Sequence, residues 1–336
     1  MAVRVAINGF GRIGRLALRA AFEAKRTDIT FVAINDLGSA EMNAHLLRRD
    51  STHGRFDAKV KVNQSSISVG GKSIKVFAER DPANLPWHAL DIDVVMECTG
   101  IFTKRADADK HIAAGAKRVL ISAPATDEDL TVVYGVNDDK LRKKHTVVSN
   151  ASCTTNCLAP VAAVLDKAVG INQGYMTTVH AYTGDQRLLD TLHSDPRRAR
   201  AAANSMIPTS TGAAKAVGKV LPKLNGKLDG TAVRVPTQNV SMIDFKFIAK
   251  KKTTADAINA AIVKASMSNR LKGILETNNE PLVSVDFNHN DASSVFDLTQ
   301  TQVIEGKLCR VLSWYDNEWG FSNRMLDTAV ALGALN

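Results

Sequence analysis

The feature that most constrains this chain is a glycine-rich turn near its N-terminus. Val3–Asn8 has the pattern of a β-strand, and the sequence G-F-G-R-I-G follows it directly at positions 9–14. A helical pattern begins near Arg12 and continues to about Ala24. A G-x-G-x-x-G turn between a strand and a helix lets the backbone approach a pyrophosphate, which the helix N-terminus attracts. The turn therefore predicts a dinucleotide-binding domain.

An acidic residue at the end of the next strand supports that prediction. Ile29–Asn35 is almost continuously apolar, as a strand buried on both faces should be. Asp36 follows it, 22 residues after Gly14, where a carboxylate can hold ribose hydroxyls. The carboxylate favours NAD because it repels a 2′-phosphate. Arg48 and Arg49 could offset that repulsion, although a solvated basic pair is the simpler interpretation.

The hydrophobic patterning divides the 336 residues into two domains. In the first half, short β-branched runs alternate with helical patterns, which is typical of a βαβ sheet. Beyond about residue 150 the strands lengthen and alternate, which indicates an antiparallel-leaning second domain. The expected divisions are a first domain over 1–151, a second over 152–316 and a C-terminal helix over 317–336 that packs back on the first. The expected strands of the second domain are Gly174–Tyr182, Thr231–Val235, Val240–Ile248 and Lys307–Trp314.

A candidate nucleophile lies where the first half ends. Thr146–Ser149 predicts a strand that runs into a helix with Cys153 in its first turn. The positive end of a helix lowers the pKa of a thiol and stabilises its thiolate. His180 would complete a Cys–His pair if the strand that it ends neighbours the preceding one. Cys157, one helical turn further, is interpreted as a small buried hydrophobic residue.

Composition narrows the class of protein. Hydrophobic residues make up 45% and charged residues 23% of the chain, as in globular proteins. The net charge of +9 favours anionic partners, but the basic clusters at 141–145 and 250–252 lack interleaved aromatic residues. We therefore expect nucleic acid only as weak electrostatic binding. Four cysteines, no zinc-ligand spacing, no leader and no spanning apolar run predict a cytoplasmic protein without a metal or a membrane contact.

The chain resembles the phosphorylating (type I) glyceraldehyde-3-phosphate dehydrogenases over nearly its whole length. The motifs that carry the resemblance are N-G-F-G-R-I-G-R at 8–15, S-N-A-S-C-T-T-N at 149–156, H-A-Y-T-G-D-Q at 180–186, R-R-A-R-A-A-A at 197–203, I-P-T-S-T-G-A-A-K at 207–215 and W-Y-D-N-E-W at 314–319. The nucleophile motif is highly specific, whereas the glycine turn alone is not. The resemblance implies an α/β protein with an N-terminal Rossmann dinucleotide-binding domain and an α+β catalytic domain with a mixed, largely antiparallel sheet.

The resemblance also implies a reaction and its residues. Cys153 would attack the aldehyde of D-glyceraldehyde 3-phosphate, with His180 as base and later acid. The thiohemiacetal would pass hydride to NAD, and inorganic phosphate would cleave the thioester to 1,3-bisphosphoglycerate. The implied cofactor contacts are Gly9, Gly11, Arg12, Ile13, Gly14, Asp36, Arg80, Ser122 and Asn317. The implied phosphate contacts are Thr183 and Arg234 for the substrate, and Ser152, Thr154, Thr211 and Gly212, with Arg198 nearby, for the attacking anion.

The same resemblance implies a homotetramer, with the loop over 182–203 near a subunit interface, and leaves glycolysis, gluconeogenesis and carbon fixation open. Strict NAD users commonly carry Leu-Pro in that loop, whereas Thr191 and Leu192 stand here. Losing the proline makes room for a 2′-phosphate, so we expect NAD preference with some use of NADP. The alternatives are an erythrose-4-phosphate dehydrogenase, a non-phosphorylating aldehyde dehydrogenase, a polyanion-binding protein and an interaction protein that has kept the fold.

Overall fold

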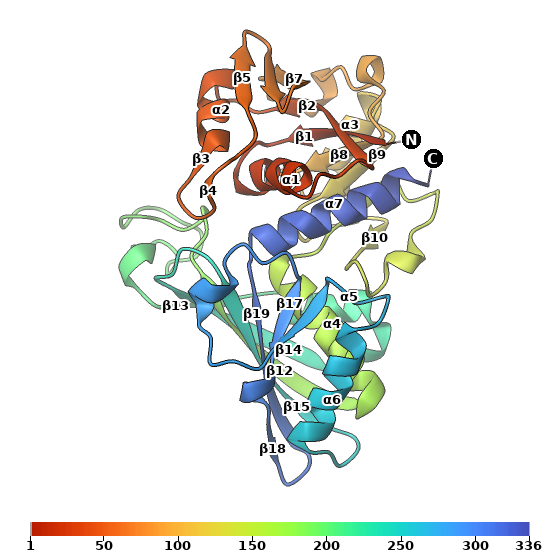
Figure 1. Ribbon diagram of the computed structural model, residues 1–336, viewed down its shortest axis with the longest axis vertical. Coiled ribbons are helices and arrows are strands. Elements are labelled where there is room, and N and C mark those ends of the chain that lie inside the picture. Colours follow the sequence, from red (N-terminus) through yellow and green to blue (C-terminus); the bar gives the residue numbers. More distant parts are fainter. Residues whose placement is uncertain (1, 336) are drawn as a thin grey trace. The chain divides into compact units, whose positions relative to one another are not determined.

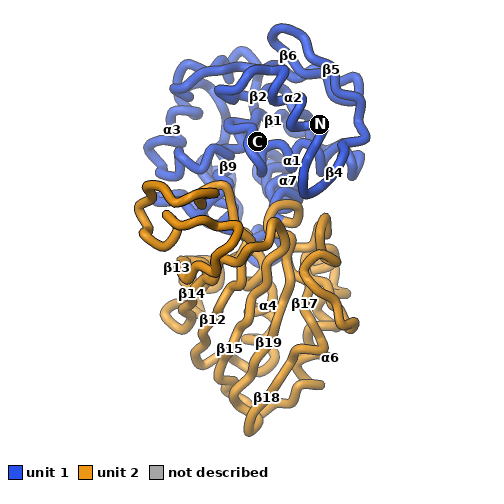
Figure 2. The backbone as a smooth tube through the Cα atoms, turned by 90° about the vertical axis from the view of Figure 1, so that its left-hand side faces the viewer, with its two compact units in different colours: residues 1–152, 321–336 blue, residues 153–320 orange. Residues whose placement is uncertain are grey.

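The structure is a computed structural model that describes residues 2–335 (Figure 1). The chain forms two compact units (Figure 2). Unit 1 contains the residues up to Ser152 together with those from Phe321 onward, and unit 2 contains Cys153–Gly320. Each unit is built on its own sheet, which gives an α/β protein with mixed sheets.

The sheet of unit 1 places its central strands side by side in parallel. Nine strands have the order β10-β11-β9-β8-β1-β2-β7-β6-β5. The strand β1 pairs with β2 on one side and with β8 on the other. The strand order therefore changes direction at β1, and such a switch point leaves a crevice at the carboxyl ends of the strands. The bounds are β1 Val3–Asn8, β2 Ile29–Asn35, β5 Val60–Asn63, β6 Ser66–Val69, β7 Lys72–Phe77, β8 Val94–Glu97, β9 Arg118–Ile121, β10 Leu130–Thr131 and β11 Val147–Ser149.

Within residues 2–335, four α-helices have residues in unit 1. They are α1 Arg12–Glu23, α2 Ala40–Arg48, α3 Arg105–Ala113 and α7 Trp319–Gly333. A separate small hairpin pairs β3 (Arg49–Asp50) with β4 (Gly54–Arg55). In α7, the Thr328 hydroxyl donates to Asn150 Oδ1 at 2.7 Å, which ties the last helix to the chain just after β11.

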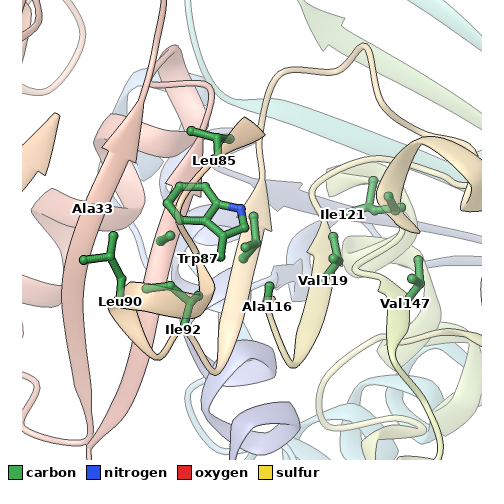
Figure 3. Close-up of a cluster of buried hydrophobic side chains, with 12 residues drawn as sticks. Ala33, Leu85, Trp87, Leu90, Ile92, Ala116, Val119, Ile121 and Val147 are labelled. Atoms are coloured by element: carbon green, nitrogen blue, oxygen red, sulfur yellow. The ribbon is translucent and has the colours of Figure 1, made fainter. Parts of the chain in front are cut away.

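A cluster of buried side chains forms a core beside β8 and β9 (Figure 3). Trp87 is its largest member and is fully buried, with its ring edge-on to Phe77 at 6.2 Å between centroids. Leu85, Leu90 and Ile92 lie near it, and the cluster continues through Val119 and Ile121 to Val147. Burying one such side chain contributes about 1.5–3 kcal/mol. Because buried polar groups are almost always hydrogen-bonded, a polar atom within this cluster needs a hydrogen-bond partner from the protein.

The glycine turn is required by close contacts between backbone segments. Gly9 has a φ of +88°, and a Cβ on it would lie 2.7 Å from the backbone nitrogen of Thr99. A Cβ on Gly14 would lie 2.3 Å from the Gly9 carbonyl oxygen. Gly11 differs, because a Cβ there would meet no atom within 4 Å. The first and third glycines thus permit the packing, whereas the second borders open space.

The sheet of unit 2 is mixed and largely antiparallel, as expected. Its order is β13-β14-β12-β15-β19-β17-β16, with β18 paired to β19. Two pairs, β12–β14 and β16–β17, are parallel, and the others are antiparallel. The bounds are β12 Ile171–Ala181, β13 Ile207–Ser210, β14 Leu228–Val235, β15 Ser241–Ala249, β16 Leu275–Asn278, β17 Ser294–Asp297, β18 Gln302–Ile304 and β19 Leu308–Tyr315.

In the described part of the chain, three α-helices lie within unit 2 and accompany this sheet: α4 Cys153–Ala168, α5 Ala213–Val220 and α6 Ala255–Ser266. Burial alternates strictly along β15, so one face of that strand is covered and the other is half-exposed. The helix α4 packs against β12, β17 and β19, and both α5 and α6 pack against α4. This packing places the N-terminus of α4 close to the carboxyl end of β12.

The glycine turn generates a stability prediction. Gly14→Ala should lower the free energy of unfolding by about 1–3 kcal/mol, because the new methyl group must displace the Gly9 carbonyl. Gly11→Ala is the matched control and should stay within about 0.5 kcal/mol of the parent, since its methyl group meets nothing. Thermal unfolding followed by circular dichroism measures both. Equal midpoints for the two variants would contradict the close contact at Gly14.

Candidate active site

The start of α4 and the end of β12 bring a cysteine and a histidine together. Cys153 Sγ lies 3.5 Å from His180 Nε2. The Nδ1 atom of His180 donates to the carbonyl oxygen of Ala181 at 2.7 Å. With the proton held on Nδ1, Nε2 faces the sulfur as an acceptor. The residues are thus arranged for the thiol to give its proton to the imidazole.

The route to this contact differs from the one predicted. The sequence made the contact conditional on neighbouring strands, and that condition is not met, because β11 and β12 belong to different sheets. Packing of α4 on β12 makes the contact instead. Sequence patterns predict where a strand lies better than which strand it pairs with, because pairing is determined by distant parts of the chain.

Burial favours the neutral form of both members of the pair. Burial, assisted by the charge of Arg234, lowers the pKa of His180 to about 3. Burial raises the pKa of Cys153, and this outweighs the lowering by Arg234, by Thr154 and by the backbone at the start of α4. The backbone at the start of α4 acts in the predicted direction and lowers the pKa of the thiol, but desolvation is the larger effect.

A buried tyrosine that the motif search did not single out supports this pair. The Tyr315 hydroxyl lies between Thr154 Oγ1, at 2.8 Å, and Thr178 Oγ1, at 2.9 Å. Its ring stands edge-on to His180 with 5.9 Å between centroids. Tyr315 thereby links α4, β12 and β19. Its only signal in the sequence was its position inside the W-Y-D-N-E-W motif.

An arginine stands beside the histidine on the parallel neighbour strand. Arg234 of β14 is in register with His180. Its Nη1 donates to Thr183 Oγ1 at 2.9 Å and to the Ala181 carbonyl at 3.2 Å. Its Nε is buried and has no hydrogen-bond partner within the described part of the chain. A buried N–H group without a partner is rare and is consistent with a ligand acceptor.

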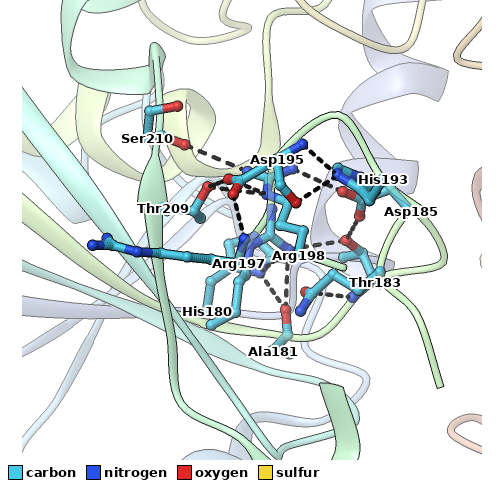
Figure 4. A network of polar contacts seen from close by, with 12 residues as sticks. His180, Ala181, Thr183, Asp185, His193, Asp195, Arg197, Arg198, Thr209 and Ser210 are labelled. Atoms are coloured by element: carbon cyan, nitrogen blue, oxygen red, sulfur yellow. Dashed lines mark hydrogen bonds and ion pairs between the residues drawn. The ribbon is translucent and has the colours of Figure 1, made fainter. Parts of the chain in front are cut away.

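A carboxylate lies between Thr183 and a second arginine, Arg198 (Figure 4). Asp185 accepts a hydrogen bond from the Thr183 hydroxyl, and its Oδ2 lies 2.8 Å from Arg198 Nη1. Arg198 also donates from Nε to Thr209 Oγ1 at 3.1 Å. The predicted residues Thr183, Arg198 and Arg234 are thus brought into one cluster. Asp185, which lies inside the H-A-Y-T-G-D-Q motif but had no predicted role, is a further member.

The remaining predicted phosphate contacts lie on two short segments. Thr211 and Gly212 stand between β13 and α5, where Thr211 Oγ1 accepts from the Ala213 backbone at 3.2 Å. Arg198 reaches the same segment through the Ser210 carbonyl at 3.4 Å. Thr154 is buried with its hydroxyl against Tyr315. Ser152 is the last residue of the first segment of unit 1.

Unit 1 holds a cavity of about 460 Å³ at the carboxyl ends of β1, β2 and β8. Four predicted cofactor contacts line it, namely Gly9, Gly11, Asp36 and Arg80. The other lining residues are Asn8, Asn35, Leu37, Glu79, Cys98, Thr99, Ile101 and Phe102.

The other predicted cofactor contacts are not among these lining residues. Arg12 is ion-paired with Asp50, whose pKa is held at about 2 although burial opposes that shift. Gly14 is buried beneath Gly9, next to Ile13. The backbone nitrogen of Ser122 donates to the Glu97 carbonyl at 2.9 Å. Asn317 belongs to unit 2, where its Oδ1 accepts from Ser241 at 2.8 Å.

The geometry of this cavity fits a dinucleotide. Asp36 Oδ2 accepts from the Phe10 nitrogen at 2.8 Å and Oδ1 accepts from the Gly38 nitrogen at 2.9 Å. Each carboxylate oxygen keeps a second lone pair, so the fixed carboxylate can also accept from two ribose hydroxyls. The open space beside Gly11 leaves room for a pyrophosphate against the backbone.

Within residues 2–335, no group of three or more His, Cys, Asp or Glu side chains is arranged to hold a metal ion. No helix among the same residues has the length and apolar character needed to cross a membrane.

Comparison with known proteins places this geometry in a family. Residues 3–105 match the NAD binding domain of glyceraldehyde 3-phosphate dehydrogenase, and residues 152–317 match its C-terminal domain. The chain is 67% identical to glyceraldehyde-3-phosphate dehydrogenase from Xanthobacter flavus and 62% identical to that from Cereibacter sphaeroides, with complete coverage of both chains in each case. It is 58% identical to the Geobacillus stearothermophilus enzyme, over 99% of each chain. The chain therefore belongs to the glyceraldehyde-3-phosphate dehydrogenase family.

Proposed function

We propose that this protein is an oxidoreductase that converts D-glyceraldehyde 3-phosphate to 1,3-bisphosphoglycerate with NAD and inorganic phosphate. The observation that carries the proposal is the 3.5 Å approach of Cys153 Sγ to an unprotonated His180 Nε2, beside the unpartnered Nε of Arg234. A nucleophile, a base and an anion-binding group are what a phosphorylating aldehyde dehydrogenase needs in one place. Family membership favours this substrate over erythrose 4-phosphate.

The first step is the attack of the thiol on the aldehyde carbon. Because the pair is neutral at rest, the proton leaves Sγ as the C–S bond forms, and His180 Nε2 receives it. The developing oxyanion of the thiohemiacetal then takes that proton from the imidazolium. The Nδ1 donation to Ala181 holds the ring in place during both transfers.

The second half of the reaction oxidises and then releases the substrate. His180 removes the hydroxyl proton of the thiohemiacetal as the C–H bond breaks, which leaves a thioester on Cys153. NAD, when bound, supplies the hydride acceptor. Inorganic phosphate then attacks the thioester carbon, the C–S bond breaks, and the acyl phosphate leaves. Cys153 departs as a thiolate and recovers its proton from the imidazolium.

Two anions must be held during this sequence. We assign the substrate phosphate to Thr183 and Arg234, because the buried Nε of Arg234 needs an acceptor. We assign the attacking phosphate to Ser152, Thr154, Thr211 and Gly212, with Arg198 joined to that segment through Ser210. For the cofactor, we assign contacts to Gly9, Gly11, Arg12, Ile13, Gly14, Asp36, Arg80, Ser122 and Asn317.

We also propose that the protein assembles as a homotetramer in the cytoplasm. Leu188, Leu189 and Leu192 are 76%, 79% and 90% exposed, and Met206 of the same loop region is 76% exposed. Large apolar side chains gathered on one loop favour burial against another chain. A reducing compartment would keep Cys153 as the free thiol that the mechanism requires.

The proposed function generates three predictions, of which the first concerns the reaction itself. With glyceraldehyde 3-phosphate and NAD, absorbance at 340 nm should rise only when inorganic phosphate is added. The rate with NADP should be lower, because Asp36 repels a 2′-phosphate. Cys153→Ser should abolish turnover, whereas Cys157→Ser, which alters the buried cysteine one turn away, should retain it. Phosphate-independent turnover, or a larger kcat/KM with NADP, would contradict the proposal.

The second prediction concerns the charge beside the nucleophile. Arg234→Gln should slow alkylation of Cys153 by iodoacetamide several-fold near neutral pH, because the arginine charge lowers the pKa of that thiol. Arg234→Lys is the control that keeps the charge and should react at nearly the parental rate. The rate is followed over pH by mass spectrometry of the Cys153 peptide. An unchanged profile for Arg234→Gln would show that the charge does not reach the sulfur.

The third prediction concerns assembly. Sedimentation velocity of the intact protein should give one species with four times the 36.2 kDa chain mass. Leu192→Asp should shift the distribution toward smaller species, because it places a charge on the most exposed of the loop leucines. A monomeric parent protein would refute the tetramer.

A further inference from the structure

A chain of buried polar side chains crosses unit 1 beneath the dinucleotide cavity. Glu97 ends β8 and is 1% exposed, and His111 of α3 is 0% exposed. Their side chains meet at 3.1 Å between Glu97 Oε2 and His111 Nε2. The mechanism proposed above uses neither residue. Two ionisable groups buried this deeply need a reason, because burying a carboxylate without full compensation is costly.

At one end of this series of hydrogen-bonded side chains, Trp87 determines which ring nitrogen of His111 carries the proton. The indole Nε1 of Trp87 lies 2.9 Å from His111 Nδ1. An indole nitrogen can only donate, so Nδ1 carries no proton. Trp87 sits inside the apolar cluster of Figure 3, so its orientation is set by packing. The proton of a neutral His111 must then be on Nε2, where it is donated to Glu97.

At the other end of the series, hydrogen bonds determine the orientation of the side-chain amides of Asn35 and Asn8. Asn35 is oriented by the backbone of Glu79, donating to its carbonyl at 2.8 Å and accepting from its nitrogen at 2.8 Å. The amide nitrogen of Asn35 donates to Asn8 Oδ1 at 2.7 Å. Asn8 must therefore turn its own amide nitrogen to Glu97 Oε2, at 2.5 Å. Both ends of the chain thus donate toward the same carboxyl group.

Glu97 consequently accepts hydrogen bonds from four donors. Its Oε2 accepts from Asn8 and His111, and its Oε1 accepts from the backbone nitrogen of Thr99, at 2.8 Å, and from the Thr99 hydroxyl. A carboxylate accepts at both oxygens, so it satisfies all four of these donors at once. The four bonds replace its hydration.

These bonds end on residues that shape the cavity. Asn8, Asn35, Glu79 and Thr99 all line it. Thr99 is also the residue against which Gly9 packs, at a distance that leaves no space for a Cβ. The backbone nitrogen of Cys98 donates to the Asn8 carbonyl at 2.7 Å, so the segment after β8 is held at several points.

We propose that Glu97 and His111 are positioning residues for the dinucleotide, holding Thr99 and Asn8 where the cofactor requires them. This inference rests on the proposed function of the cavity as an NAD site. The carboxylate acts through its two oxygens, each of which receives two donors, and these bonds set the distance between the ends of β1 and β8. It does not touch the cofactor or the reacting atoms.

The test exploits the direction of each hydrogen bond. Glu97→Gln keeps the shape of the side chain but replaces one acceptor by a donor, so a donor must face either Thr99 or the Asn8–His111 pair. Combining Asn8→Asp with Glu97→Gln restores complementarity. In this double variant, the carboxylate introduced at position 8 accepts from Asn35 and from the amide introduced at position 97. The His111 Nε2 atom, which lies 3.4 Å from Asn8 Nδ2 in the parent, can donate to the same carboxylate.

The measurement is the Kd of the intact protein for NAD, by isothermal titration calorimetry, together with steady-state constants. Glu97→Gln should raise this Kd about tenfold, the scale on which outer partners affect the groups they orient. The KM for glyceraldehyde 3-phosphate and kcat at saturating NAD should stay within about twofold. The double variant should recover most of the affinity. Glu41→Gln, an exposed carboxylate of unit 1, is the control and should bind like the parent.

Two results would overturn the inference. One is Glu97→Gln binding NAD as tightly as the parent, and the other is a double variant that binds no better than Glu97→Gln. A parent protein that binds no NAD would instead contradict the proposed function. Failure of the inference and failure of the proposed function are therefore distinguishable.

If Glu97→Gln does not accumulate in folded form, the Kd for NAD is measured for His111→Gln and His111→Leu instead. The glutamine can donate to Glu97 and accept from Trp87, so that variant should bind like the parent. The leucine can do neither, so that variant should bind about tenfold less tightly. Equal affinities for the two variants would contradict the proposal.

Discussion

The arrangement of both units depends on how polar groups at the carboxyl ends of buried strands obtain hydrogen bonds. A strand that ends in a core must satisfy its last polar groups from the protein, because no water reaches them. In unit 1 this requirement gathers donors around Glu97 at the end of β8. In unit 2 it gathers donors around the Ala181 carbonyl, which accepts from His180 and from Arg234. The bonds that stabilise each strand end also orient the side chains beside the proposed site.

Within unit 2, the consequence is a defined tautomer of His180. The Ala181 carbonyl accepts a hydrogen bond from Nδ1, Arg234 Nη1 lies 3.1 Å from the same nitrogen and donates to the same carbonyl, and the Tyr315 ring stands edge-on to the imidazole. Burial and the arginine charge then keep the imidazole neutral, so a low pKa and a fixed orientation have the same origin. The proposed mechanism follows directly, with proton transfer during attack rather than from a preformed ion pair.

Much of this could be predicted from sequence because the relevant signals are local. The glycine turn after β1, Asp36 at the end of β2 and the cysteine that begins α4 are each defined by adjacent residues. The parallel pairing of β12 with β14 was not predictable, since the chain between them passes through a long loop, β13 and α5. The Glu97–His111–Trp87 contacts come from three separate segments without a motif, although a glutamate closing the apolar run of β8 was a signal. The raised pKa of Cys153 depends on burial, which a helix position alone does not report.

The protonation of the Cys153–His180 pair tests this account most directly. Neutron diffraction from deuterium-exchanged crystals of the resting protein at pH 6 locates the exchangeable atoms themselves. Because the pKa of His180 is about 3 and that of Cys153 is raised, the account predicts deuterium on Nδ1 of His180, none on Nε2, and a protonated Sγ. Deuterium on both ring nitrogens beside a bare sulfur would show a thiolate–imidazolium pair and would contradict the account.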